Sequence, residues 1–509
     1  MTASQRLALN TVATYGRSIF NIGLGLFASR WVLNALGQTD FGLFAIVGSI
    51  IVSMTFLNAT MASSVARYYA YSIGQGQARE VTNWFNVALS MHLCLATVLV
   101  LIGLPIGEYV IKHILTMPMD RISTCLWVFR ISLVSAFFSM ISVPFVAMFT
   151  AHQKITEVAF WGIVQTVLSF ILAFSLTQIT GNLLLIYTIA MTSIIVSVQL
   201  MMVFRAFVVF KECQLSFSYW FNGKRFKNIF SFASWTLIGE LGGTVRNQGS
   251  AILLNIYFGP GMNSAFGIAK QVSAGADQLA MAMLNAFSPE ITASEGRGDR
   301  LRMLSLSNRA NKFGSILILI FAIPLMVEME YILKIWLKVP PQHTTMFCRL
   351  MLTTFLIDRL TGGFLLAVKA HGKIAAYQAT IGGIIMMTLP LAWFFFIQGF
   401  SPTSLGVAYI ITIVACTLSR VFWVRHLLGV SFYLWLKTAV FPNLLIGSLS
   451  AAVSYLLVFC MQESFVRILF VLFISMSVSA LACWFWVFDA SEHEFISKNY
   501  QKILAKLNL

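Results

Sequence analysis

Charged residues are scarce in this chain of 509 residues, and acids are scarcer than bases: 18 Asp and Glu stand against 34 Lys and Arg. Only 10% of the residues are charged, whereas 58% are hydrophobic and the mean hydropathy is +0.82. This composition excludes a soluble multidomain protein and is typical of a polytopic membrane protein. The net charge of +16 lies in short segments between apolar runs, which indicates contact with membrane lipids and not with nucleic acid.

Several functional motifs are also missing. The seven cysteines are an odd number without a C-x-x-C pair, and the scattered histidines have no metal-ligand spacing, so we expect neither a disulfide framework nor a metal site. Gly223-Lys224 and Gly372-Lys373 lack the spacing and the following Ser or Thr of a phosphate-binding loop. No nucleophile–base arrangement is evident. We therefore expect no catalytic residue and no cofactor.

What the chain does contain is a series of long apolar runs. Each approaches the ~20 residues that cross a bilayer core of ~30 Å at 1.5 Å per residue. Fourteen such spans are predicted, at residues 10–35, 41–64, 83–107, 123–148, 158–178, 183–206, 230–258, 264–288, 312–333, 346–369, 374–398, 403–424, 438–460 and 466–487. The sequence thus predicts an all-α membrane protein.

Lys and Arg are unevenly distributed between the loops. With a cytoplasmic N-terminus, the cytoplasmic segments hold 22 of the 34, Lys312 and Arg420 among them, and the opposite side holds 5, including Arg467. Cytoplasmic loops are enriched in Lys and Arg, so both termini are predicted to be cytoplasmic. Outer loops of at most about 16 residues leave no room for an outer catalytic domain.

An internal repeat divides the chain. Its elements recur in order, with Leu33-Asn34, Gly37, Phe41-Gly42 and Gly74–Arg79 matched by Leu254-Asn255, Gly259, Phe266-Gly267 and Gly296–Arg300. Both copies run in the same direction through the membrane, so the repeat is parallel. We predict two six-helix lobes (1–206 and 230–424), a linker with an interfacial helix (207–229), two further helices (425–487) and a cytoplasmic tail (488–509).

Ionisable residues lie deep inside several spans, where a charge costs roughly 2.5–3.5 kcal/mol and therefore faces a bundle interior or a wet cavity. The acids are Glu240, Asp277 and Asp358, and the cations are Arg17, Arg30, Arg130, Arg246, Lys270, Arg349 and Arg359. A chamber with this positive surplus attracts anions, and the planar fork of Arg suits phosphate.

Helical spacing groups some of these residues. Lys270 and Asp277 are seven apart and share a helix face, as do Glu240 and Asn247. Three alternatives stay open. Arg17 and Arg349 lie near span ends and can reach the interface, Arg30 fits either the interface or the chamber, and Asp358 can simply neutralise Arg359.

Two motifs give the chain a resemblance to a known family. Leu36-Gly37-Gln-Thr-Asp-Phe41-Gly42-Leu-Phe lies between the first two spans, and Phe226-Lys-Asn-Ile-Phe230-Ser-Phe-Ala-Ser enters the seventh. With fourteen spans split 6 + 6 + 2, the chain resembles the polysaccharide-transporter branch of the multidrug/oligosaccharidyl-lipid/polysaccharide (MOP) flippase superfamily, the Wzx-type O-antigen and capsule flippases. The resemblance implies two lobes around a cavity that opens alternately to either side.

The resemblance also implies a cargo and a location. The cargo would be an undecaprenyl-pyrophosphate-linked oligosaccharide in the bacterial inner membrane, and polysaccharide polymerase or export proteins would be partners. Arg30 and Arg246 would meet the pyrophosphate. The full predicted substrate-binding set is Arg30, Arg246, Lys270, Asn247 and Arg359, and the predicted residues for H⁺ or Na⁺ coupling or gating are Glu240, Asp277 and Asp358.

Two other functions compete with the flippase. A multidrug antiporter of the same superfamily exports organic cations and needs acids in its cavity, but the first six spans contain no interior Asp or Glu. A membrane glycosyltransferase or glycan ligase needs reactive groups on an accessible face, commonly in large outer loops, which this chain lacks. The flippase is therefore the favoured hypothesis, and the chain is not expected to be an enzyme.

Overall fold

The computed structural model describes residues 3–490 and residue 493, apart from residues 56, 153, 221 and 373. For residues 3–22 and 231–240, and for some positions of α2, α5 and α8, the backbone alone is described. Over this part of the chain every regular element is a helix. The predicted all-α fold is confirmed.

The helices of the first half follow the predicted order. They are α1 (Ala3–Thr55), α2 (Leu57–Gly74), α3 (Ala78–Tyr109), η1 (Val110–Ile114), η2 (Met119–Arg121), α4 (Ile122–Ala151), α5 (Ile155–Ser175), η3 (Leu176–Gln178) and α6 (Leu183–Val209). Asn182 begins α6 as its N-cap, because its side-chain oxygen accepts a hydrogen bond from the backbone N–H of Leu185.

The second half contains longer and more broken helices. They are η4 (Phe217–Tyr219), α7 (Gly223–Phe258), α8 (Pro260–Gly296), α9 (Arg300–Val327), α10 (Met329–Leu337), α11 (Thr344–Arg359), α12 (Gly362–His371), α13 (Ala375–Met386), α14 (Thr388–Ile397), α15 (Ser404–Leu428), α16 (Phe432–Trp435), η5 (Leu436–Val440), α17 (Phe441–Cys460), α18 (Phe465–Ala482) and η6 (Cys483–Val487). In both halves, each predicted span falls on one helix or on two consecutive ones.

Ten helices of the described chain are long and apolar enough to cross a membrane. An eleventh span results if α11 and α12, which are bent by 43° at the break between them, are counted together. The helices α7 and α8 are not among them, although at 36 and 37 residues both are long enough to span a bilayer. They carry the polar and charged residues that led the sequence to predict a chamber, and part of each helix has no described side chains.

The backbone supports the internal repeat. Gly37 interrupts α1 with φ 75° and ψ 171°, and its repeat partner Gly259 separates α7 from α8 with φ 77° and ψ −179°. The second pair of turn glycines also matches, because Gly76 and Gly298 have φ 69° and 76°. Residues with a Cβ rarely adopt a positive φ, so glycine is required at the equivalent turns of both copies. The two halves thus share local geometry as well as sequence.

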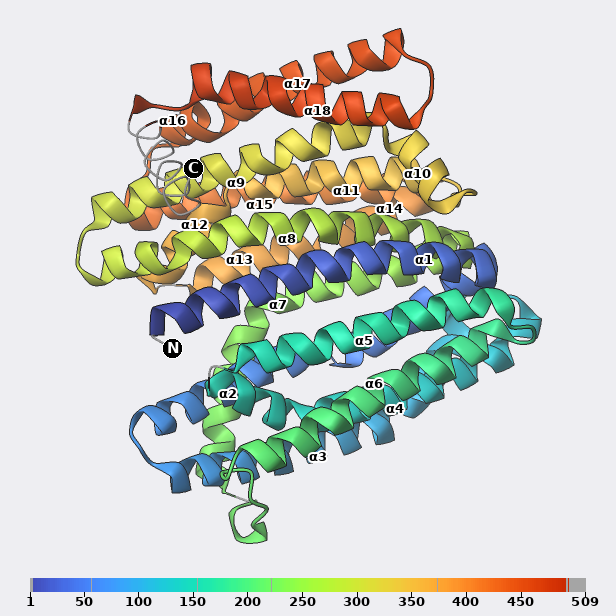
Figure 1. Cartoon of the computed structure of the whole chain (residues 1–509), viewed down its shortest axis with the longest axis vertical. Coiled ribbons are helices and arrows are strands. Elements are labelled where there is room, and N and C mark those ends of the chain that lie inside the picture. Colours follow the sequence, from blue (N-terminus) through green and yellow to red (C-terminus); the bar gives the residue numbers. More distant parts are fainter. Residues whose placement is uncertain are drawn as a thin grey trace. The chain divides into compact units, whose positions relative to one another are not determined.

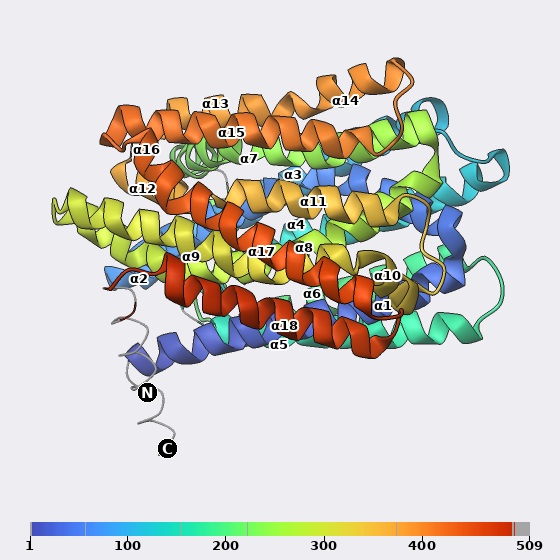
Figure 2. The same ribbon diagram turned by 90° about the horizontal axis from the view of Figure 1, so that it is seen from above.

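The chain groups into two compact units. Unit 1 comprises Met1–Gln271, Val339–Phe347 and Gln378–Ala408, and unit 2 comprises Val272–Lys338, Cys348–Tyr377 and Tyr409–Leu509. In unit 2, α17 and α18 run side by side and both pack against α9 (Figures 1 and 2). The lobe boundaries derived from the sequence remain a prediction.

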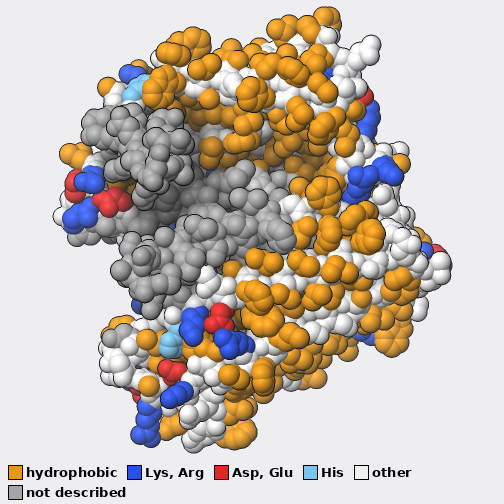
Figure 3. Space-filling view, viewed as in Figure 1, with side chains coloured by type: hydrophobic (Ala, Val, Ile, Leu, Met, Phe, Trp, Pro, Cys, Tyr) orange, Lys and Arg blue, Asp and Glu red, His pale blue; other side chains and the backbone are white. Residues whose placement is uncertain are grey.

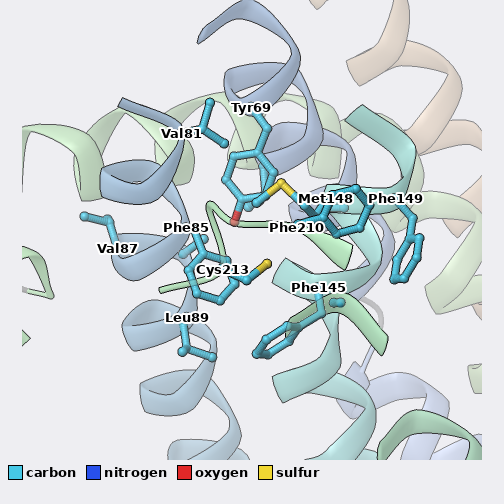
Figure 4. Packing of buried hydrophobic residues seen from close by; sticks show 14 of the residues in the cluster. Tyr69, Val81, Phe85, Val87, Leu89, Phe145, Met148, Phe149, Phe210 and Cys213 are labelled. Atoms are coloured by element: carbon cyan, nitrogen blue, oxygen red, sulfur yellow. The ribbon is translucent and has the colours of Figure 1, made fainter. Parts of the chain in front are cut away.

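One end of unit 1 has a tightly packed apolar core. Residues of α2, α3, α4 and the segment after α6 meet there, and the side chains of Tyr69, Phe85 and Phe149 are fully buried. Figure 4 shows Cys213 among them, next to Phe85. Burial raises the pKa of the Cys213 thiol to about 12. This core fixes α2, α3, α4 and α6 at the end where the linker leaves α6.

The linker differs in detail from the prediction. Within residues 207–229 the structure has one turn of 3₁₀ helix, Phe217–Tyr219, and the first turns of α7, which begins at Gly223. Asn222 caps α7 by accepting a hydrogen bond from the N–H of Arg225. The cations expected on an interfacial helix are therefore on the first turn of α7 itself.

Candidate functional site

Two predicted cavity cations of unit 1 lie near each other on successive helices. Arg246 belongs to α7 and Lys270 to α8, and they are close enough for their positive charges to repel. The Lys270 ammonium also lies 5.7 Å from the centre of the Phe266 ring, within reach of a cation–π interaction. Arg246 and its neighbour Asn247 are half-buried. The structure thus brings these members of the predicted set into one region.

For Arg30 and Glu240, the other two predicted residues of this unit, the structure shows less of the surroundings. Arg30 is half-buried on α1, before the break at Gly37, and among the described residues no carboxylate forms an ion pair with it. The side chain of Glu240 lies outside the described residues. The predicted roles of Arg30 and Glu240 therefore stay predictions.

Two acids near the predicted outer ends of helices in unit 1 pair with arginines. Asp40 lies 3.2 Å from the guanidinium of Arg121, and Glu108 accepts hydrogen bonds at 2.8 Å from Arg130. The pairing with Glu108 gives Arg130 a structural role. An acid already paired with an arginine is a poor binding group for an organic cation.

A second cluster of charges lies inside unit 2. Arg359, the last residue of α11, lies 2.7 Å from Asp277 of α8 and 3.3 Å from its neighbour Asp358. Asp358 also accepts a hydrogen bond at 2.7 Å from Arg420 of α15. The Arg359 guanidinium lies 4.6 Å from the centre of the Phe355 ring. Two acids and two arginines thus form one chain of contacts.

This network lies at the break between α11 and α12. A broken helix leaves backbone carbonyls without their usual partners, and buried carbonyls need replacements. Arg420 donates to the carbonyl oxygen of Asp358 at 3.3 Å and to the hydroxyl of Thr361 at 3.2 Å. The indole N–H of Trp435 donates to the carbonyl oxygen of Leu360 at 3.0 Å. The charges therefore stabilise the break at which α11 and α12 are bent by 43°.

Sequence reasoning missed Arg420. It was counted with the cytoplasmic cations, but it is 8% exposed and its guanidinium bonds to Asp358. Arg467 was likewise assigned to an outer loop, yet it is buried and forms a bidentate pair with Glu328, at 2.8 and 2.9 Å. Both residues lie within about five residues of a predicted span end. When a cation lies this close to a span end, the sequence does not indicate whether its side chain turns toward the protein interior or toward water.

Arg349 has a local structural role. Its Nε donates to the carbonyl oxygen of Met326 at 2.9 Å, near the C-terminus of α9. Carbonyls in the last turn of a helix have no intrahelical partner, and a cation there also complements the helix dipole. Arg349 thus stabilises the end of α9.

Two of the cavities among the described residues have volumes of about 350 and 530 Å³. The smaller lies in unit 1 and is lined by Glu157, Trp161 and Arg205, with Thr156 and Phe160. The larger lies in unit 2 between α9 and the segment that precedes α17. Residues other than the predicted substrate-binding set line both, so the pyrophosphate chamber remains a prediction.

The fold is similar to several solved transporter structures. The lipid II flippase MurJ, in an inward closed conformation, has a TM-score of 0.68 at 14% identity, over 94% of this chain and 99% of that one. An inward-facing multidrug resistance MATE family transporter of the MOP superfamily has a TM-score of 0.66 at 14% identity, over 84% and 98%.

A third similar structure is a MOP superfamily transporter from Pyrococcus furiosus, described as having a binding pocket of reverse polarity. Its TM-score is 0.59 at 13% identity, over 82% of this chain and 95% of that one. Neither a family model nor a curated protein matches the sequence. At these identities the likeness concerns the fold, and this chain has the fold of the MATE transporters and the MurJ flippase of the MOP superfamily.

Proposed function

We propose that this protein is a MOP-superfamily flippase that moves an undecaprenyl-pyrophosphate-linked oligosaccharide, such as an O-antigen, capsule or exopolysaccharide unit, across the bacterial cytoplasmic membrane. Its fold is shared with a lipid II flippase and with drug transporters, so fold alone does not choose the cargo. The choice depends on the charge of the membrane-embedded residues.

The observation that carries the proposal is that two membrane-embedded cations, Arg246 and Lys270, belong to successive helices of one compact unit. Two like charges in a region of low dielectric raise each other's energy, and a bound anion offsets that repulsion. A pyrophosphate offers several oxygens to the planar Arg fork and to the Lys ammonium. Asn247, next to Arg246 in the chain, adds an amide that can bind a sugar hydroxyl or a phosphate oxygen.

The acids of the same unit argue against an organic cation as cargo. The predicted first six spans contain no interior Asp or Glu, and Asp40 and Glu108 at their outer edges already pair with arginines. A drug cation entering this unit would meet positive charge. We therefore favour the anionic cargo over the multidrug antiporter.

The charge network of unit 2 supplies a way to couple transport to an ion gradient. Asp277 is 45% exposed at its side chain, whereas Asp358 is 20% exposed and is held by two arginines. Protonation of Asp277 would weaken its bond to Arg359 and leave Arg359 with Asp358 alone. In this proposal Asp277 is the proton carrier, and Asp358 and Arg359 transmit the change to the α11–α12 bend.

The test is translocation of a fluorescent lipid-linked oligosaccharide in proteoliposomes that contain the purified protein. We expect Arg246→Gln and Lys270→Gln to slow translocation at least tenfold each, a loss of about 1.4 kcal/mol or more of binding or barrier energy. Lys112→Gln is the matched control. Lys112 is an exposed cation that pairs with Glu108 at 3.5 Å, and its loss should leave the rate unchanged.

Unchanged translocation in an Arg246→Gln, Lys270→Gln double variant would remove these cations from the mechanism. Resistance to cationic dyes, conferred by this protein on a pump-deficient host, would favour the multidrug antiporter instead. In cells, deletion of the gene should trap a pyrophosphate-linked oligosaccharide in the inner leaflet.

A further inference from the structure

The larger cavity, in unit 2, has a volume of about 530 Å³, within the range of small-ligand sites. It lies between the first turns of α9 and the connection from α15 to α17, which includes α16 and η5. The residues that line it belong neither to the matched motifs of the internal repeat nor to the proposed transport path.

Its polar lining suits an anion. Arg309 and Lys312 of α9 contribute two positive charges, and Asp489 contributes one negative charge. Each of the three also has a partner inside the protein, and together they give the lining a net positive charge. Lys312 is only 9% exposed, and its ammonium lies 5.7 Å from the centre of the Phe488 ring. Because Lys312 is buried in the cavity wall, where the dielectric constant is low, its interaction with a phosphate is stronger than it would be in water.

Neutral polar groups in the same lining add a second recognition element. The buried Oδ1 atom of Asn308 has no hydrogen-bond partner among the described residues, and the hydroxyl groups of Ser431 and Thr438 also line the cavity. Leaving a buried acceptor unsatisfied costs about 1–3 kcal/mol. A ligand that carries hydroxyl donors beside its phosphate would satisfy Asn308 and bind the cations at the same time.

Apolar side chains form another part of the lining. Leu304, Val430 and Leu434 face the cavity together with Leu301, which is 84% exposed. The site lies at the end of α9 where Arg300, Arg302 and Arg309 lie, the end that the distribution of Lys and Arg places at the cytoplasmic leaflet. Anionic phospholipids give that leaflet its negative surface potential, and basic pockets between membrane helices there bind their headgroups.

We propose that this cavity binds one anionic phospholipid with a hydroxylated headgroup, of the phosphatidylglycerol class, as a resident lipid distinct from the transported cargo. Its phosphodiester interacts with Arg309 and Lys312, and its headgroup hydroxyls donate to Asn308.

Native mass spectrometry of the full-length protein in mild detergent tests this proposal. After delipidation, the protein is titrated with phosphatidylglycerol or with phosphatidylcholine. We expect one phosphatidylglycerol to bind at least tenfold more tightly than phosphatidylcholine. The Arg309→Gln, Lys312→Gln double variant should lose that preference, and Lys437→Gln should keep it. Lys437 is an exposed cation of η5 outside the cavity lining, next to Thr438.

Several outcomes would overturn the proposal. One is equal affinity for the two lipids, and another is unchanged phosphatidylglycerol binding in the double variant. Full competition by millimolar inorganic phosphate would make the site one for a free anion. If the double variant does not fold, Ser305→Trp tests whether the cavity is the lipid site. The tryptophan would fill the cavity from an exposed position without removing charge. Retained lipid preference in Ser305→Trp would contradict the assignment.

Discussion

At the scale of single residues, unit 2 contains a buried pair of opposite charges. Arg467 and Glu328, with side chains 7% and 1% exposed, form two parallel hydrogen bonds in unit 2. Removing one partner of such a pair leaves an uncompensated buried charge, which costs more than the pair itself contributes. The arrangement ties the start of α18 to the segment between α9 and α10.

We expect Arg467→Met to lower the free energy of unfolding by about 3–5 kcal/mol, because Glu328 stays buried without its partner. The Arg467→Met, Glu328→Gln double variant should recover much of this loss. Apparent melting temperatures in detergent, compared at one heating rate, measure both. Lys334→Gln is the control, since Lys334 is 47% exposed and pairs with Glu330 at 3.2 Å, which should be worth no more than about 1 kcal/mol. Equal melting temperatures for Arg467→Met and Lys334→Gln would contradict this account.

At the scale of helices, close packing depends on glycine at specific positions. Gly42 of α1 touches the carbonyl of Pro260, the first residue of α8, and an added Cβ would overlap that carbonyl. Gly242 of α7 similarly approaches the backbone of Gly382 on α13, where a Cβ would lie 2.7 Å from a carbonyl oxygen. Small residues allow helix backbones to approach closely in membrane proteins, where packing drives association. Both contacts lie within unit 1.

We expect Gly42→Ala to destabilise the protein by about 1–3 kcal/mol, because the backbone of α8 would have to move away. Gly48→Ala on the same helix is the matched control. Gly48 has open space where a Cβ would be placed, so alanine there should be neutral or stabilising by up to about 1 kcal/mol. Thermal unfolding of the two variants in parallel gives the comparison. A lower melting temperature for Gly48→Ala than for Gly42→Ala would be inconsistent with the packing described.

At the scale of the whole molecule, the surface is apolar over the helices and charged toward their ends. Large side chains such as Phe204, Phe459 and Phe473 are more than 70% exposed on helices apolar enough to span a membrane. On the face drawn in Figure 3, hydrophobic side chains form a broad area, and Lys, Arg, Asp and Glu gather toward two opposite sides. This distribution is that of a protein surrounded by lipid.

The predicted orientation can be tested by cysteine labelling in a variant without the seven native cysteines. Thr180, between α5 and α6, and Gln75, between α2 and α3, are both exposed. A membrane-impermeant maleimide should label Thr180→Cys in intact cells and Gln75→Cys only after permeabilisation, because the Lys and Arg bias places residue 75 in the cytoplasm. The reverse pattern would invert the topology, and labelling of both in intact cells would contradict the placement of residue 75.

The sequence by itself determined the helices, their order and the repeat. Apolar length and the placement of glycines are local properties, so they indicated the helical segments and the equivalent turns at Gly37 and Gly259. Sequence also placed Asp277, Asp358 and Arg359 inside predicted membrane spans.

Only the tertiary structure decided which charges meet. Arg420 is 62 residues from Asp358, and Arg467 is 139 residues from Glu328. Contacts over such separations leave no periodic pattern in the sequence. The side chain of a cation near a span end can turn to water or to the protein interior at a similar local cost in free energy. The partner that a distant helix supplies settles that choice. For the same reason the cavity between α9 and the α15–α17 connection has no counterpart in the sequence pattern.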